Sequence, residues 1–283
     1  MHFTLYTLVA AMVLLTAPAD AQKRGAFVAF DGETKDWAAV FKRMQDAGMN
    51  TAILQYTCTT DGYFYNEETD AFVNAAEIAG MDYYLGLRYH ETWDTNGAAV
   101  PMYVDDSIEL LTKLLAPKVL NAKHFQGWYM ALEVGNDKKA VEHTGKLMEI
   151  AKKSSRPIAM SVYFNPDVGD GKLSPKAFAK KIKTTIKEYD IVLFQDSVGE
   201  HGTWAARKLP DYYTAVARHA RQTWIIAEAF RGDCSATEAE YKKQLEAARA
   251  LKGGTNIFAF EFLKNFRPTS GPLAAWKETF AKP

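Results

Sequence analysis

Short, almost wholly apolar runs alternate with longer amphipathic stretches along this 283-residue chain. In the longer stretches the apolar residues recur every three or four positions, as Ala38, Phe41 and Met44 do, which is typical of helices that bury one face. The apolar runs are short and are flanked by turn residues. This pattern predicts strands that are covered on both faces, as in a parallel sheet.

Eight such strand–helix pairs follow one another without interruption. The expected strands cover residues 25–31, 50–56, 81–88, 125–133, 156–164, 190–196, 223–230 and 256–262. The expected helices lie around residues 37–48, 70–79, 105–115, 138–153, 175–188, 209–221, 238–251 and 273–280. This series predicts an α/β fold, a single (β/α)8 TIM barrel. An open doubly wound sheet is the alternative, but no glycine-rich phosphate-binding motif follows any of the strands.

The N-terminus has a pattern of its own. Residues 5–15 are almost wholly apolar but too few to span a bilayer, and residues 18–21 have the small-residue spacing that signal peptidase reads. The segment before them carries only His2 and no lysine or arginine, which departs from the usual signal peptide. We expect a signal peptide over 1–21 and a mature barrel over 22–283, secreted or periplasmic, with no stable membrane association after cleavage. A short membrane anchor is the alternative.

Composition narrows the possible partners. The chain has 34 basic and 34 acidic residues and no basic stripe, so neither nucleic acid nor an anionic membrane is expected to bind. The hydrophobic content is enough for one sizeable core, and we expect a monomer. Cys58 and Cys234 follow strands that would not be neighbours, so no disulfide is expected between them.

Polar residues end every expected strand, and barrels of this class place their chemistry at those ends. These residues are Asp31, Gln55, Tyr56, Arg88, Glu133, Tyr163, Asn165, Gln195, Asp196, Glu228 and Glu261. Alternation along each strand predicts that the polar end shares a face with apolar residues below it. Examples are Ile53 below Gln55, Ile226 below Glu228, and Ala259 below Glu261. The pattern predicts a packed interior capped by a polar cup.

Three glutamates, Glu133, Glu228 and Glu261, follow apolar strands on this one rim. A single glutamate at a strand end is more often a salt-bridged or solvated residue, but three together favour a function. Burial among aromatic side chains raises a carboxyl pKa and suits it to act as an acid, and glycosidic hydrolysis uses two such groups. Aromatic platforms and polar donors for a sugar are supplied by Tyr56, Trp93, Tyr129, Tyr163, Gln55, Arg88 and Gln195.

Several stretches together resemble a known family. They are "GMNTAILQYT", "GMDYYLGLRYHETW", "FQGWYMALEVGN", "SVYFNP", "IVLFQDSVG", "WIIAEAF" and "FEFLKNFRP". The sequence is similar to the DUF4434 family, exported TIM-barrel proteins that resemble glycoside hydrolases. The resemblance covers about residues 25–268.

The wider similarity is to retaining glycosidases of the large TIM-barrel clan, and it implies roles for individual residues. Glu133 would be the general acid and base, and Glu228 the nucleophile, with Glu261 as an alternative member of the pair. An asparagine usually precedes the acid in that clan, whereas this chain has Leu132. The residues expected to position sugar hydroxyls are Gln55, Arg88, Tyr163, Gln195, Asp196 and Glu261.

Two other functions stay open from the sequence. Leu132 fits a barrel that binds carbohydrate without cutting it. A metal-dependent enzyme could use an oxygen-rich site, but transition metals favour imidazole, and only His90 and His201 lie near strand ends. We therefore expect no metal and no organic cofactor. The carboxylates that could form such a site are Asp31, Glu133, Glu228 and Glu261.

Overall fold

The computed structural model describes residues 22–58, 63–88, 100–133, 148–149, 151–164, 172–252 and 256–280. The side chains of residues 100–104 and 132–133 lie outside this description, although their backbone is included. The expected signal peptide over 1–21 and most of the expected helix over 138–153 also lie outside it.

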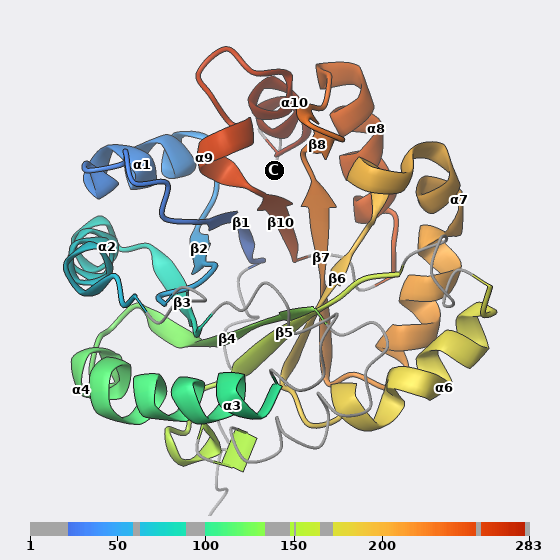
Figure 1. The fold of residues 1–283 in the computed structure, drawn as a ribbon. Coiled ribbons are helices and arrows are strands. Elements are labelled where there is room, and N and C mark those ends of the chain that lie inside the picture. Colours follow the sequence, from blue (N-terminus) through green and yellow to red (C-terminus); the bar gives the residue numbers. More distant parts are fainter. Residues whose placement is uncertain are drawn as a thin grey trace, which may run out of the picture.

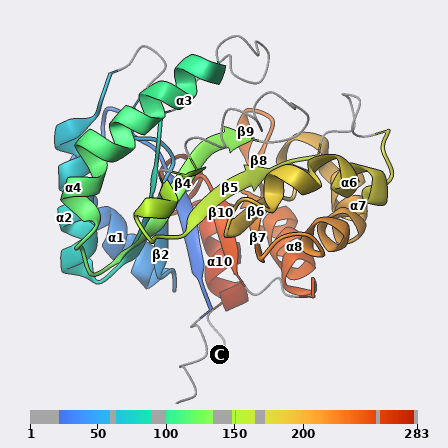
Figure 2. The same cartoon turned by 90° about the horizontal axis from the view of Figure 1, so that it is seen from below.

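Within the described residues, eight parallel strands close into a barrel, with helices around the outside (Figure 1, Figure 2). The strands are β1 (Arg24–Val28), β2 (Thr51–Leu54), β3 (Asp82–Gly86), β4 (Phe125–Glu133), β5 (Ile158–Val162), β6 (Ile191–Gln195), β7 (Gln222–Glu228) and β10 (Ile257–Phe260). Parallel pairing of β1 with β10 closes the ring. The predicted (β/α)8 barrel is confirmed.

The outer layer consists of helices that follow the strands in the chain. They are α1 (Trp37–Asp46), α2 (Asn66–Ala79), α3 (Val100–Glu109), the π-helical η1 (Leu110–Leu115), α4 (Ala116–Val119), α6 (Pro175–Ile186), α7 (Val198–Ala217), α8 (Glu238–Arg249), α9 (Phe262–Asn265) and α10 (Gly271–Phe280). A short hairpin follows β7, formed by β8 (Phe230–Arg231) and β9 (Cys234–Ser235). None of these helices has both the length and the apolar character needed to cross a membrane.

Helix α7 begins earlier than its predicted start at Leu209. Ser197 adopts a left-handed conformation (φ 54°, ψ 17°) and turns the chain from β6 directly into a first helical turn. Gly202 (φ 57°, ψ −135°) then breaks the helix before it continues. The two interruptions hide the apolar period at this end of the helix, so the pattern indicates only the later part.

The core has two layers, one inside the barrel and one between the strands and the helices. The interior cluster comprises Phe27, Ile53, Tyr84, Tyr129, Ala131, Ala159, Ile191, Leu193, Trp224, Ile226 and Phe258. Trp224 and Phe258 stack across it, with ring centroids 5.2 Å apart. Burial of these large side chains removes the barrel axis from water and is a main source of stability.

The predicted alternation is confirmed for β2 and β7 but is wrong for the last strand. Ile53 and Ile226 lie in the interior as expected. On β10, however, Phe258 lies in the interior, whereas Ile257 and Ala259 pack in the outer layer. Every residue of β10 is apolar, so the sequence carries no alternation from which its inward face could be chosen.

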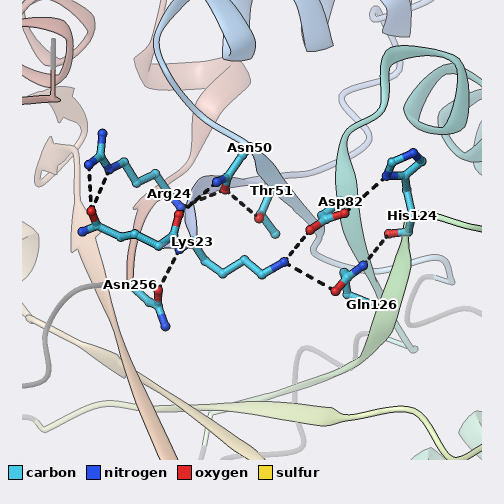
Figure 3. A network of polar contacts seen from close by, with 9 residues as sticks. Lys23, Arg24, Asn50, Thr51, Asp82, His124, Gln126 and Asn256 are labelled. Atoms are coloured by element: carbon cyan, nitrogen blue, oxygen red, sulfur yellow. Dashed lines mark hydrogen bonds and ion pairs between the residues drawn. The ribbon is translucent and has the colours of Figure 1, made fainter. Parts of the chain in front are cut away.

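Polar side chains connect the starts of several strands at the opposite, N-terminal end of the barrel (Figure 3). Lys23, just before β1, donates through its ammonium group to Asp82 of β3 and, at 3.4 Å, to Gln126 of β4. Its backbone N–H donates to Asn256 Oδ1 at 2.8 Å, just before β10. Asp82 also contacts His124 Nδ1 at 3.3 Å. These contacts tie four strands together at one end.

Asn50 extends this network to β2 (Figure 3). Its Oδ1 accepts hydrogen bonds from the Arg24 N–H at 3.0 Å and from the Thr51 hydroxyl at 2.9 Å. Its amide nitrogen donates to the Gln22 carbonyl at 2.9 Å. Polar contacts at this end of a barrel serve stability, since the chemistry lies at the other end.

We expect Asp82→Asn to lower the free energy of unfolding by about 1–3 kcal/mol, because it leaves the partly buried Lys23 ammonium without its charged partner. Asp46→Asn is the matched control, since Asp46 pairs with Lys42 on the exposed face of α1 and such pairs contribute little. Urea unfolding of both variants tests this. Equal losses in the two variants would contradict the role assigned to the network.

Candidate active site

The strand ends bring several of the predicted residues to one rim. Because all eight strands are parallel, their C-terminal ends lie at the same end of the barrel. Glu228 ends β7 and pairs in register with Phe260 of β10, while Gln195 ends β6 opposite Ile226. Glu133 ends β4 at the register position of Ser161, after an irregularity in the β4–β5 pairing. The backbone positions of both predicted catalytic glutamates are therefore on this rim.

Glu228 is buried on the face that continues the interior positions of Trp224 and Ile226. Its Oε2 accepts a hydrogen bond from the Gly199 backbone N–H at 2.7 Å. A charged acceptor makes this one of the stronger classes of hydrogen bond. The contact fixes the orientation of a carboxylate at the mouth of the barrel.

Gly199 is close enough to Glu228 only because it lacks a side chain. A Cβ at this position would lie 2.8 Å from Glu228 Oε2 and 2.7 Å from the ring of Phe230. The glycine of the "QDSVG" stretch was visible in the sequence, but nothing in that stretch indicated which strand it would face.

Asp196 lies on the other side of the strand layer, away from the barrel mouth. Its side chain has no exposed surface. Oδ1 accepts from the Val198 N–H at 3.1 Å and from the Glu228 N–H at 3.3 Å, and Oδ2 accepts from the Gln244 side-chain amide of α8. The carboxyl expected to contact a sugar is thus surrounded by protein donors, which leaves it no surface for substrate.

Burial raises the pKa of Asp196 from its ordinary 3.8 to about 7, and the hydrogen bonds from Val198, Gln244 and Glu228 act in the opposite direction. A carboxyl with such a pKa binds a proton in the folded protein at pH values where it would be ionised in the unfolded chain. Strand alternation could have indicated this placement, because Ile191 and Leu193 face inward and Asp196, three positions after Leu193, then falls on the outer face.

Glu261 caps a helix that the sequence did not predict. Its carboxylate accepts hydrogen bonds from the backbone N–H groups of Leu263 at 3.1 Å and Lys264 at 3.2 Å, at the start of α9. Burial raises its pKa, the neighbouring charge of Asp31 adds to this, and the backbone donors lower it. The alternation grouped Glu261 with Ile257 and Ala259, which pack in the outer layer and not in the interior. The carboxylate oxygens of Glu261 are used in capping.

Three of the expected sugar-positioning residues lie half-buried at strand ends: Gln55 after β2, Tyr163 after β5, and Gln195 at the end of β6. Tyr56, next to Gln55, is also half-buried and packs on the interior cluster. These side chains retain surface at the rim and remain candidates for contact with a ligand.

Arg88 and Tyr129 lie deeper than expected. Arg88 is buried and forms an ion pair with Asp106 of α3. Tyr129 lies inside the barrel, where its hydroxyl shares a 2.7 Å hydrogen bond with Ser161 Oγ and its ring packs on Phe27. A ring enclosed in the core offers no flat face to a sugar. Trp93, the other expected aromatic platform, lies outside the described residues, as do the strand-end residue Asn165 and the possible metal ligand His90.

Asp31 and His201, which were considered as metal ligands, contact neighbouring protein groups. Asp31 is exposed and accepts hydrogen bonds from the backbone N–H groups of Glu33 and Thr34 and from the Thr34 hydroxyl. Partial burial tends to raise the pKa of Asp31, but these hydrogen bonds outweigh it, and the pKa is lowered. His201 lies 3.5 Å from Glu200 on α7. Over the part of the chain that the structure describes, no three His, Cys, Asp or Glu side chains gather as a possible metal site. Cys58 is buried and Cys234 is exposed, and the two do not form a disulfide.

A cavity of about 380 Å³ lies outside the barrel, between α7 and α8. It is lined by Val198, Gly202, Thr203, Ala206, Leu209, Arg231, Glu240, Lys243, Gln244 and Ala247. Gln244 links its wall to Asp196 and, through a 2.9 Å hydrogen bond, to the Glu228 carbonyl. The cavity therefore lies on the outer side of the strands, next to the residues that bind the backbone of Glu228.

Comparison with known proteins confirms the family resemblance. The family described as "Domain of unknown function (DUF4434)" matches residues 29–271, which is most of the chain. A comparison with curated proteins finds no sequence match.

Solved structures of similar fold include several glycoside hydrolases. A GH18 chitinase from Pseudoalteromonas aurantia has a TM-score of 0.61 and 9% identity, covering 92% of this chain and 99% of that one. The PgaB (BpsB) glycoside hydrolase domain from Bordetella bronchiseptica has a TM-score of 0.55 and 12% identity, with 92% and 99% covered. A β-mannanase from the blue mussel Mytilus edulis has a TM-score of 0.53 and 10% identity, with 92% of each chain covered. At such low identities the likeness shows a glycosidase-like barrel fold.

The raised pKa of Asp196 predicts a pH dependence of stability. Its contribution is fully present below about pH 4 and is lost as the pH rises through about 7, because the folded state holds the proton more tightly than the unfolded chain. The difference in unfolding free energy between wild type and Asp196→Asn should therefore fall over this range. Urea unfolding at several pH values measures it. A difference that stays constant from pH 4 to 8 would contradict the raised pKa.

Proposed function

Because this chain belongs to the DUF4434 family and its barrel has the fold of several glycoside hydrolases, we propose that it hydrolyses glycosidic bonds in a polysaccharide or oligosaccharide. The observation that carries the proposal is Glu228, a carboxylate buried at the C-terminal rim and held at 2.7 Å by the Gly199 N–H. The barrel fold places its chemistry at this rim.

In the proposed reaction Glu228 is the nucleophile. Its carboxylate attacks the anomeric carbon as the bond to the leaving oxygen breaks, which forms a covalent glycosyl–enzyme intermediate. The Gly199 N–H supports this role by holding the carboxylate in one orientation, so less orientational freedom is lost when the sugar arrives. Water then displaces the sugar from Glu228 and completes hydrolysis.

Glu133 is the proposed general acid and base. It protonates the leaving oxygen in the first step and takes a proton from the attacking water in the second. Its backbone position supports this role, since β4 ends on the same rim as β7 and only β5 and β6 lie between them in the ring. Leu132 stands where the related glycosidases usually have asparagine, so the sugar contact that asparagine would provide must come from another residue.

The half-buried side chains at the rim supply the proposed sugar contacts. Gln55 and Gln195 offer amide donors and acceptors, while Tyr56 and Tyr163 offer aromatic faces with a polar tip. We propose that the mature chain works as a monomer in the periplasm or outside the cell, after loss of residues 1–21. No metal or organic cofactor takes part in this scheme.

We expect Glu133→Gln and Glu228→Gln to abolish most glycan cleavage, since an amide can neither donate the required proton nor attack carbon. For Glu133 the expected loss in kcat is about 10²–10⁴-fold. The measurement is product release by the mature chain from a broad panel of polysaccharides and oligosaccharides. Glu246→Gln, at an exposed position of α8, is the control and should behave as wild type.

Two results would count against this assignment. Undiminished cleavage by Glu228→Gln would remove the nucleophile. If wild type and both variants bind a glycan but none cuts it, the barrel is a carbohydrate-binding module and not a hydrolase.

Gly199→Ala should lower kcat by about 10²-fold while the barrel still folds. The added methyl group overlaps Glu228 Oε2 and the Phe230 ring, so the carboxylate has to move, and small misplacements of a reacting group are costly. Thr203→Ala, at an exposed position of the same helix, is the matched control. Circular dichroism and steady-state kinetics test the pair. Wild-type kcat in Gly199→Ala would show that the Gly199–Glu228 contact has no part in catalysis.

A further inference from the structure

A buried polar pair, Asp196 and Gln244, lies behind the rim on the outer side of β6 and β7. Asp196 has no exposed surface, and Gln244 is 4% exposed. Neither side chain takes part in the reaction proposed above. Burying two polar groups here is costly unless they are hydrogen-bonded, so their partners indicate what they do.

Both side chains bind the backbone of Glu228. Asp196 Oδ1 accepts from the Glu228 N–H at 3.3 Å, and the Gln244 amide nitrogen donates to the Glu228 carbonyl at 2.9 Å and to Asp196 Oδ2. Asp196 Oδ1 also accepts from the N–H of Val198, the residue before Gly199. The same carboxyl therefore binds the backbone of Glu228 and the backbone of the residue next to Gly199, on either side of the Gly199–Glu228 hydrogen bond.

On the basis of the proposed glycosidase function, we propose that Asp196 and Gln244 are positioning residues for Glu228. They fix the backbone of Glu228 relative to the start of α7, and so keep the Gly199 N–H aimed at the Glu228 carboxylate. They act through these contacts and do not touch the sugar. In this scheme α8, on the outside of the barrel, contributes to the geometry of the reacting group.

The hydrogen-bond donors around Asp196 determine which side chain can stand at this position. Every protein partner named here for the Asp196 carboxyl is an N–H donor, so the ionised carboxylate, present above its raised pKa, matches them with an acceptor at both oxygens. An asparagine has the same shape, but its NH₂ group would face a donor from Gln244. Turning the Gln244 amide to relieve that conflict would place Oε1 against the Glu228 carbonyl, which is also an acceptor. Asp196→Asn is therefore nearly isosteric but cannot satisfy the network.

Tyr241 provides a matched control on the same helix. It is fully buried, and its hydroxyl donates to the Ala227 carbonyl at 3.4 Å, one residue before Glu228 in β7. Tyr241→Phe thus removes a buried contact between α8 and β7 and leaves the hydrogen bonds of Asp196 and Gln244 in place.

The test compares Asp196→Asn, Gln244→Met and Tyr241→Phe in the mature chain by two measurements. The first is amide hydrogen exchange at Gly199, read by NMR relative to amides of β2 and β3 on the far side of the barrel. We expect about tenfold faster exchange at Gly199 in the first two variants and wild-type exchange in the third. The second is steady-state kinetics on a substrate of the wild type, where kcat should fall about 10²-fold with KM little changed.

Wild-type protection of Gly199 in both Asp196→Asn and Gln244→Met would overturn the proposal. Equal acceleration of all amides would do the same, because it would indicate general destabilisation. If Asp196→Asn does not fold, Gln244→Met decides, since it removes the amide and leaves the carboxyl in place. The exchange measurement needs no substrate, so a wild type that cuts no glycan would refute the proposed function separately from the positioning role.

Discussion

The structure depends on closure of a parallel sheet into a ring through the pairing of β1 with β10. Closure removes both sheet edges and requires each strand to be apolar on its inner and outer faces, one packed along the barrel axis and one under the helices. Because every strand runs in the same direction, the ring also gathers all eight C-terminal ends at one rim. Polar residues that are far apart in the sequence become neighbours there through this constraint alone.

The two ends of the barrel carry different polar structures. At the N-terminal end, Lys23, Asn50 and Asp82 bind side chains and backbone groups of neighbouring strands and close a network that holds the strand starts together (Figure 3). At the C-terminal end, Glu228 is held through a backbone donor, and half-buried Gln55 and Gln195 retain surface. One end is suited to stability and the other to binding and chemistry, which is the usual division in this fold.

Much of this arrangement could be predicted from the sequence. The eight strands were identifiable from their apolar runs, and the inward faces of β2 and β7 followed from alternation. The inward face of β10 could not be predicted, because "IFAF" is apolar at every position and both faces are buried. The role of Glu261 was missed for the same reason, and because a glutamate is an unusual helix N-cap.

The support behind the rim was harder to foresee. Gln244 lies on the apolar face of α8 beside Tyr241, Leu245 and Ala248, and a polar residue on that face was the available signal. Its partner, however, is a carboxyl that lies 48 positions earlier in the chain. Sequence spacing cannot identify a contact between two buried groups at that separation. Only the packing of α8 against the strand layer brings them together.

The most direct test of the two-carboxylate account is a crystal structure of residues 22–283, from which the separation of the Glu133 and Glu228 carboxyl groups is measured. The account predicts both side chains in the barrel mouth at about 5–5.5 Å, the spacing of a retaining glycosidase. A spacing of roughly 6.5–9.5 Å would keep the pair but change the mechanism to inversion. Glu133 turned out of the mouth, or a separation well beyond that range, would contradict the account.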